Sequence, residues 1–378
     1  MESSVNHKAI VSALLDSHTT NQNPLYPFKS KIDIKISVYP TNNRRGYKIT
    51  KVDVEDHFID DSNKGGESLK LLDNYLYEFG IETTKQIQSA SNDWNSFYIL
   101  KEIIQKIECF SFDDAPQQPI TNHYDLFYRG QNHDFTMLPG IARSDSFDTI
   151  RLAENFESLY KDLSYEYEEL KYVPFSIDEN HFTNPIRDRV TQLALLQHYG
   201  FPTPLVDVTS SPFVGMFFMS HIFNYSDSYK GEDESSTLTI FLSKKGRHDS
   251  LFQKAEVTSV NRRLKPQFGS FIDYEMLAQQ NFDVTPVNDH AIHISFVYDS
   301  DSHKASHKNS DNEDRLPNKT TSKYNKMLQK MHQSIREDIE AKLSEYHYRY
   351  IDLFPDLENR AAHIKEVYRH QPEDYTLD

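Results

Sequence analysis

The chain has 378 residues, with 41 Lys and Arg against 57 Asp and Glu, so its formal net charge is −16 with neutral His. This surplus of negative charge excludes non-specific binding to nucleic acids, although a local basic pocket stays compatible with it. The single cysteine, Cys109, excludes an intrachain disulfide and a cysteine-cluster metal site, and it favours a reducing compartment. No apolar run approaches the roughly 18 residues of a membrane helix, and the N-terminus lacks the hydrophobic region of a signal peptide. We therefore expect a cytoplasmic protein that does not bind membranes.

The first 90 residues show the patterns of a strand pair and a helix. Apolar and polar residues alternate over residues 32–38, which predicts a half-buried strand, and residues 42–46 form a suitable turn into a second strand. Apolar residues recur at helical spacing over residues 67–79, and Gly80 suits the C-terminal cap of that helix. We expect residues 1–90 to form an N-terminal α/β accessory segment.

The rest of the chain alternates between helical and strand patterns. Helices are predicted from about residue 92 and over residues 152–170, 187–199 and 323–346, and strands over residues 126–130, 237–243, 268–272 and 291–297. Residues 299–322 carry almost no apolar side chains, which predicts a disordered insertion because such a segment cannot offset its ordering entropy by burial. The predicted fold class is α+β, with a mixed sheet core flanked by helices. The main domain covers residues 91–364, and a C-terminal tail covers residues 365–378.

Four motifs follow one another along the main domain. They are Tyr128-Arg129-Gly130-Gln131 with Leu138-Pro139 and Arg143 after it, the run LALLQHYGFPTPLVDVT at residues 193–209, Gln267-Phe268-Gly269-Ser270-Phe271, and Leu353-Phe354-Pro355-Asp356-Leu357. In order and kind these motifs resemble the FRG domain family, from about Trp94 to Ile364. The chain departs from the family pattern at Pro204, where an Arg is usual. The resemblance implies a fold and a site, and it implies no reaction.

Arg129 is the first candidate for a ligand contact. A guanidinium at the end of an aromatic strand can hold a phosphate bidentately, and Gly130 beside it would let a ligand or another backbone come close. A buried structural ion pair is the alternative role for Arg129. The motif favours the ligand contact.

The second motif supplies a histidine, an amide and a carboxylate. His198 lies at a helix end before two prolines, and a structural, hydrogen-bonded role competes with a catalytic one. Gln197 either braces this turn or contacts ligand amides, and Asp207 either caps the next helix or braces an Arg. Three hydroxyl residues follow that either support the pocket or cap the same helix, namely Thr209, Ser210 and Ser211.

The order of these elements is similar to that of ADP-ribosyltransferases. By this analogy Arg129 holds the phosphate or ribose of NAD, and a carboxylate stabilises the cationic ribose centre. Family spacing favours Glu168, with Glu169 beside it, whereas strict analogy favours Glu275. We predict four catalytic residues for an NAD-dependent ADP-ribosyltransferase or glycohydrolase, namely Arg129, His198, Asp207 and Glu168. The predicted cofactor-binding residues are Tyr128, Gly130, Gln131, Gln197, Thr209, Ser210, Ser211 and Gln267.

Two non-enzymatic interpretations stay open beside this one. In the first, the same pocket recognises a small nucleotide ligand or a modified terminus and the N-terminal segment recruits a protein partner, in a regulatory or defence role. In the second, the whole chain is an interaction protein and the insertion is a tether. No metal is expected, because no His-Glu-x-x-His pair occurs. A Ser-His-Asp hydrolase built from Ser210, His198 and Asp207 would lack a nucleophile elbow.

Overall fold

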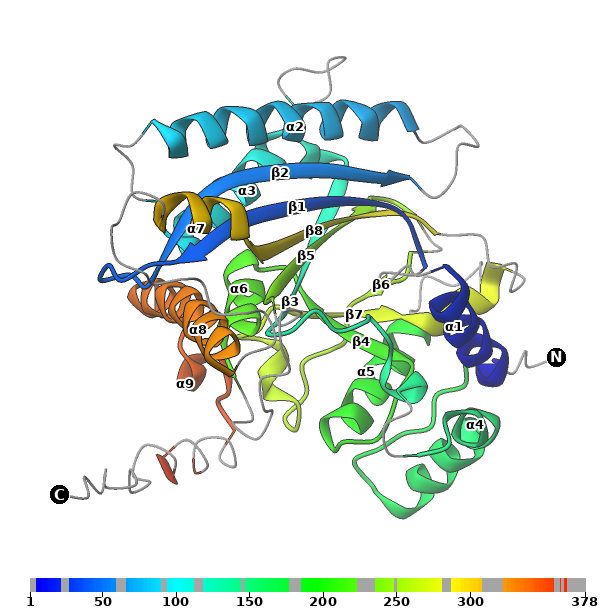
Figure 1. The fold of residues 1–378 in the computed structure, drawn as a ribbon. Coiled ribbons are helices and arrows are strands. Elements are labelled where there is room, and N and C mark those ends of the chain that lie inside the picture. Colours follow the sequence, from blue (N-terminus) through cyan, green and yellow to red (C-terminus); the bar gives the residue numbers. More distant parts are fainter. Residues whose placement is uncertain are drawn as a thin grey trace.

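A mixed β-sheet forms the centre of the protein (Figure 1). The computed structural model describes residues 5–21, 27–58, 66–89, 94–111, 118–143, 147–176, 185–222, 235–247, 250–280, 287–307, 322–356, 361 and 364–365. In these ranges the strands are β1 (Phe28–Pro40), β2 (Tyr47–Phe58), β3 (Tyr124–Gln131), β4 (Leu205–Thr209), β5 (Thr237–Lys244), β6 (Phe252–Gln253), β7 (Gly269–Asp273) and β8 (Val287–Tyr298). They lie in the order β2-β1-β8-β5-β3-β4-β7-β6, and β1 and β8 run parallel while the other neighbours are antiparallel.

Helices flank both faces of this sheet. They are α1 (His7–Asn21), α2 (Gly66–Gln88), α3 (Ser96–Cys109), α4 (Thr149–Glu166), α5 (Pro185–His198), α6 (Pro212–Ser220), α7 (Ser300–His307), α8 (Ser322–Glu345) and α9 (Tyr350–Leu353). One apolar cluster joins α2, α3, α6 and α8 to the face that carries Ile240 and Ile294. A second cluster joins α1, α4 and α5 to the face that carries Phe127 and Phe241. The predicted α+β fold, a mixed sheet flanked by helices, is confirmed.

The first 90 residues share this sheet with the rest of the chain. β1 and β2 form the predicted hairpin, and Gly46 in its turn takes a φ of +81°, which glycine adopts without steric cost. β1 also pairs with β8 from Phe28 opposite Val287 to Val38 opposite Tyr298. A division at residue 90 would therefore separate two strands from the sheet that they extend.

Gly80 lies inside α2, so the predicted helix end at this residue is wrong. A Cβ at this position would lie 3.1 Å from the carbonyl oxygen of Val52 and 3.1 Å from Cγ2 of Val54, both on β2. The glycine therefore lets α2 approach the strand closely, and the helix continues to Gln88.

Part of the segment predicted to be a disordered insertion is helical. α7 is held by His303, whose side chain is buried. Its Nδ1 lies 2.9 Å from the hydroxyl of Tyr298, and its ring stacks on Tyr39 with 5.4 Å between the centroids. Aromatic contacts order this helix although its sequence holds few aliphatic residues. Residues 308–321 of the predicted insertion, and residues 366–378 of the predicted tail, lie outside the described residues.

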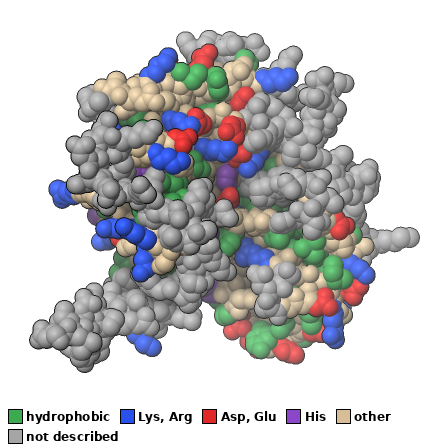
Figure 2. Space-filling model, viewed as in Figure 1, with side chains coloured by type: hydrophobic (Ala, Val, Ile, Leu, Met, Phe, Trp, Pro, Cys, Tyr) green, Lys and Arg blue, Asp and Glu red, His purple; other side chains and the backbone are tan. Residues whose placement is uncertain are grey.

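Charges of both signs lie mixed over β1 and β2 on the face shown in Figure 2. Lys35 pairs with Glu55 at 2.6 Å, and Lys51 pairs with Asp53 at 2.8 Å. Across these two strands the acidic side chains are therefore partly neutralised. Within the described ranges, no helix combines the length and the apolar character needed to cross a membrane.

Candidate functional site

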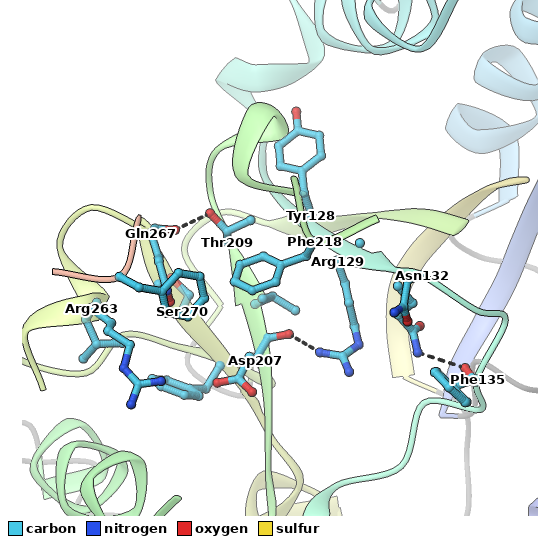
Figure 3. A pocket seen from close by; sticks show the side chains of 17 residues that line it. Tyr128, Arg129, Asn132, Phe135, Asp207, Thr209, Phe218, Arg263, Gln267 and Ser270 are labelled. Carbon is cyan, nitrogen blue, oxygen red and sulfur yellow. Dashed lines mark hydrogen bonds between the residues drawn. The ribbon is translucent and has the colours of Figure 1, made fainter. Parts of the chain in front are cut away.

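The sheet opens between β3 and β4. These strands pair at a single position, Tyr128 with Thr209, whereas β3 pairs with β5 along its whole length. Beside this pair lies a cavity of about 370 Å³ (Figure 3). Its polar lining includes Arg129, Gln131, Asn132, Asp207, Thr209, Arg263, Gln267 and Ser270, and its apolar lining includes Phe135, Val208, Phe218, Leu264, Phe271 and Phe354.

Arg129 crosses the gap between the two strands. Its Nη1 donates a hydrogen bond of 2.6 Å to the main-chain carbonyl oxygen of Asp207 (Figure 3). Its Nε is buried and has no hydrogen-bond partner among the described residues. Burial lowers the pKa of Arg129, the charge of Asp207 opposes this shift, and the charge of Arg143 adds to it. The cavity wall therefore holds a desolvated guanidinium with an unused donor.

Asp207 supplies a carboxylate to the same cavity. Its Oδ2 accepts a hydrogen bond of 2.8 Å from Nε2 of Gln197, whose Oε1 in turn accepts one of 2.6 Å from the hydroxyl of Thr203. The carboxylate opens to the cavity while protein surrounds its other sides, and this desolvation raises the pKa of Asp207. The positive charges of Arg129 and Arg143 act against that rise. Gln197, predicted to bind cofactor, thus holds Asp207 and is not among the lining residues.

Tyr128 and Gly130 face the other side of β3 from Arg129. The Tyr128 side chain points away from the cavity (Figure 3), and its hydroxyl donates to Oε1 of Glu108 at 2.7 Å. A Cβ on Gly130 would overlap the carbonyl oxygen of Gly215 and the amide nitrogen of Met219 on α6. A Cβ on Gly215 would lie 2.9 Å from Cβ of Tyr128. Tyr128 and Gly130 line the cavity, but the close packing of α6 on β3 sets the side-chain size that these two positions and Gly215 allow.

The three hydroxyl residues after Asp207 divide between the cavity and the helix. Thr209 lines the cavity, and its Oγ1 donates to the carbonyl oxygen of Gln267 at 2.6 Å. Ser211 caps α6 by accepting from the amide of Val214 at 3.4 Å. Ser210 is exposed and is not among the described residues that line the cavity. The capping alternative therefore holds for Ser211.

His198 does not line the cavity and contacts a residue that does. Its Nδ1 lies 2.8 Å from Nη2 of Arg263, and Arg263 both lines the cavity and pairs with Asp356 at 2.8 Å. Gln267 donates from Nε2 to the carbonyl oxygen of Leu353 at 3.0 Å, which holds the C-terminal motif against the cavity. The sequence prediction did not select Arg263 or Phe354 as site residues. Their positions in the sequence could have indicated them, because Arg263 lies just before the third motif and Phe354 lies within the fourth.

Glu168 does not reach the cavity. It is exposed in the chain that follows α4, as is Glu169, and neither belongs to the described lining. Family spacing cannot show that the helix ends before these residues and turns them toward solvent. The placement gives no support for a catalytic role of Glu168.

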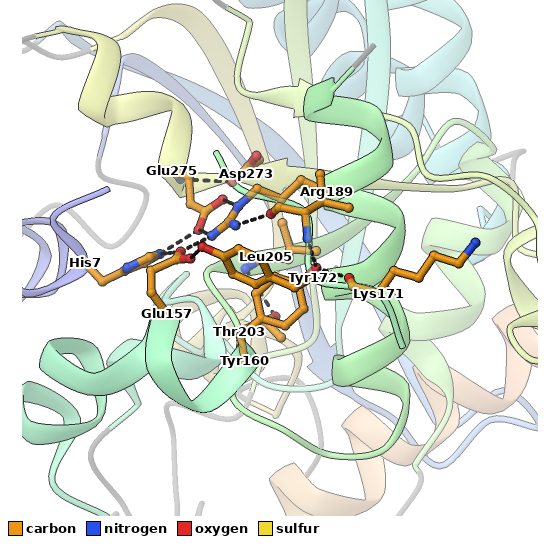
Figure 4. Close-up of polar contacts among 11 residues, drawn as sticks. His7, Glu157, Tyr160, Lys171, Tyr172, Arg189, Thr203, Leu205, Asp273 and Glu275 are labelled. Carbon is orange, nitrogen blue, oxygen red and sulfur yellow. Dashed lines mark hydrogen bonds and ion pairs between the residues drawn. The ribbon is translucent and has the colours of Figure 1, made fainter. Parts of the chain in front are cut away.

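Glu275 is buried in a separate network of charged groups (Figure 4). Its carboxylate accepts from Nε and Nη2 of Arg189 at 2.6 and 2.7 Å and lies 2.6 Å from Nε2 of His7. Arg189 also donates to Glu157 and to the carbonyl oxygen of Val173. Burial alone would raise the pKa of Glu275, but Arg189 and His7 lower it to about 2. Both carboxylate oxygens of Glu275 are engaged in these contacts, so the arrangement does not favour a role of Glu275 as the carboxylate of a transferase.

His7, Glu157 and Glu275 also have the spacing of metal ligands. Arg189 already donates to both carboxylates and neutralises part of their charge. A divalent ion would have to displace this guanidinium, so the side chains present do not fit a metal site.

A family model described as FRG domain matches residues 124–227. The match begins with β3, ends beyond α6, and includes Arg129, Asp207 and Thr209. Arg263 and Gln267, on the opposite wall of the cavity, lie outside it. No curated protein and no solved structure matches the chain significantly.

Proposed function

We propose that this chain, which carries an FRG domain over residues 124–227, binds a small phosphate-bearing ligand of the nucleotide type in the cavity between β3 and β4. The observation that carries the proposal is the buried, unused Nε of Arg129 in the cavity wall. Unsatisfied buried donors are rare in folded proteins, and at a cavity they favour a bound acceptor.

Anion binding follows from the charges beside the cavity. Among the described residues Arg129 has no carboxylate ion pair, and Arg143 is close enough to lower its pKa. Two neighbouring cations with a free donor favour a phosphate, because a guanidinium presents its N–H groups in a fork that matches phosphate oxygens. The net charge of −16 opposes general anion binding, so selectivity rests on this local arrangement.

Aromatic side chains in the cavity lining could contact the base of a nucleotide-type ligand. Phe135 lines the cavity although its residue surface is 54% exposed, and Phe218 and Phe354 form part of the other walls. Flat apolar rings can stack on a base or on another planar group of a ligand. A volume of about 370 Å³ lies within the range of small-molecule sites.

Calorimetric titration with ADP-ribose tests this proposal. Arg129→Gln removes the charge and the Nε donor, and charge-assisted hydrogen bonds contribute about 1.5–3 kcal/mol each. We therefore expect a loss of affinity of roughly tenfold to 150-fold. Arg187→Gln is the matched control, because Arg187 is exposed and pairs with Glu256 away from the cavity. Equal affinity of Arg129→Gln and wild type, with both variants folded, would contradict the proposal.

Asp207 supports a second candidate function, the processing of NAD. It is the one carboxylate in the described lining, and it lies beside Arg129 (Figure 3). In such a reaction the glycosidic bond breaks, nicotinamide leaves with the bonding electron pair, and an oxocarbenium-like ribose forms that water or another nucleophile attacks. An ionised carboxylate stabilises that cation. Glu275 is occupied by Arg189 and His7, and Glu168 does not line the cavity, so this role falls to Asp207.

Nicotinamide release from NAD, followed by chromatography, separates the two functions. Turnover by wild type that Asp207→Asn abolishes would support NAD processing. Ligand binding without nicotinamide release would remove the second candidate and leave the first, the non-catalytic binding module.

A further inference from the structure

Polar side chains form two rows that start at the cavity and cross the sheet. The rows are Arg129, Thr239 and His293, which lie opposite one another on β3, β5 and β8, and Gln131, Thr237 and Ser295 on the same three strands. Alternate residues of a strand face the same side. Phe127 and Phe241 are the next pair along and belong to the second apolar cluster. Both rows therefore lie on the face of the sheet that Arg129 occupies.

Thr237 is the unusual member of these rows. Its residue is 0% exposed, and its Oγ1 has no hydrogen-bond partner among the described residues. Thr239 differs, because its hydroxyl lies 3.1 Å from Nδ1 of His293. A buried hydroxyl without a partner is destabilising, so Thr237 calls for an explanation. Together with Nε of Arg129 it gives two unused polar groups on neighbouring strands.

Residues 132–136 lie over the rows and contact the neighbouring strands through polar groups. Nε2 of Gln131 donates to the carbonyl oxygen of Phe135 at 3.2 Å, and the Ser236 hydroxyl donates to the carbonyl oxygen of Asn132 at 3.3 Å. Asp134 lies 3.5 Å from Nε2 of His293. The contacts of Asn132 and Asp134 are long for direct hydrogen bonds, so they hold these two residues loosely.

The residue that follows this segment is packed into the protein interior. Met137 is buried, and its carbonyl oxygen accepts from the hydroxyl of Tyr274 at 3.2 Å. A ligand that reaches the rows would therefore have to displace residues 132–136, of which Asn132 and Phe135 also line the cavity.

We propose that the polar side chains beneath residues 132–136 form a second subsite, in which Thr237 of one row and Thr239 and His293 of the other bind the hydroxylated, sugar-like part of a phosphorylated ligand. This inference rests on the proposed phosphate contact at Arg129. Neighbouring strands are about 4.8 Å apart, so His293 lies roughly 10 Å across the sheet from Arg129 and Thr237 lies nearer. That spacing matches a phosphate at Arg129 with its sugar directed across the sheet along the two rows. Burial lowers the pKa of His293, which favours the neutral ring that can both donate and accept hydrogen bonds.

Binding of two probes, inorganic phosphate and ribose 5-phosphate, tests the subsite. Wild type should bind ribose 5-phosphate at least tenfold more tightly than phosphate. Thr237→Val should lose most of this preference and bind phosphate as wild type does. Equal affinity of wild type for both probes, or an undiminished preference in Thr237→Val, would overturn the subsite while the Arg129 contact stands. No binding of either probe would overturn the phosphate contact and the subsite with it.

Thermal unfolding without ligand supplies a second readout. Thr237→Val should raise the melting temperature, because it removes an unpartnered hydroxyl and keeps the side-chain shape. Thr191→Val is the matched control, since Thr191 is also buried but its hydroxyl donates to the carbonyl oxygen of Arg187 at 2.8 Å and accepts from the amide of Glu256 at 2.9 Å. The control should lower the melting temperature and leave binding unchanged. A fall for Thr237→Val would show that its hydroxyl is satisfied in the free protein and would overturn the inference.

Discussion

Replacing Glu275 by Gln removes the charge at the centre of the buried network and leaves its shape nearly intact. Arg189 would keep Glu157 but lose the carboxylate that accepts from its Nε and Nη2. The pKa of Glu275 falls from its ordinary 4.5 to about 2, and each pKa unit corresponds to about 1.4 kcal/mol, so the network stabilises the folded state by about 3 kcal/mol through this group. Breaking one partner of a buried ion pair costs about 3–5 kcal/mol, which agrees with that figure.

Urea unfolding monitored by circular dichroism measures this loss. Glu275→Gln should lower the free energy of unfolding by about 3 kcal/mol at pH 7, while Glu168→Gln, at an exposed position, should change it by less than about 0.5 kcal/mol. Because the folded pKa is depressed, the contribution of Glu275 is present above pH 4.5 and is lost as the pH falls toward 2. The Glu275→Gln variant should lack this dependence. A loss below about 1 kcal/mol, or equal losses in both variants, would refute the structural role assigned to Glu275.

Three further predictions concern the cavity and its supports. Gly130→Ala should cost about 3 kcal/mol or more in urea unfolding, the upper end for overpacking, because the new Cβ meets the α6 backbone; a cost below about 1 kcal/mol would contradict the packing described. Calorimetry from pH 4 to 8 should show that ADP-ribose binds more tightly as the pH falls through the raised pKa of Asp207, because protonation removes the repulsion between this carboxylate and the anion. The Asp207→Asn variant should bind ADP-ribose more tightly than wild type at pH 7, and its affinity should depend less on pH. Gln197→Leu should move the same profile to higher pH, since it removes the hydrogen bond that stabilises the ionised carboxylate; an unmoved profile would show that Gln197 does not tune Asp207.

Local patterns predicted elements well where each element could be recognised from its own residues. Alternation over residues 32–38 and the turn before Tyr47 located the β1–β2 hairpin. The pairing of β1 with β8 joins segments that are about 260 residues apart along the chain, and no local pattern encodes such a partner. Gly80 was mistaken for a helix end for the same reason. The glycine is needed where α2 lies against β2, and the local sequence does not reveal this contact.

The candidate site was predictable in its motifs and not in its chemistry. Arg129, Asp207, Thr209 and Gln267 were selected from three motifs, and the structure places all four at one cavity. The choice between Glu168 and Glu275 could not be made locally, because Arg189 and His7, which occupy Glu275, come from α5 and α1. A carboxylate's role depends on partners that only the folded chain brings to it.

The most direct test of the anion site is a crystal structure of the protein with saturating ADP-ribose. The proposed function predicts a phosphate oxygen within about 3 Å of Nε of Arg129. An unoccupied cavity at saturating ligand, or a phosphate bound elsewhere while this Nε stays without a partner, would contradict it.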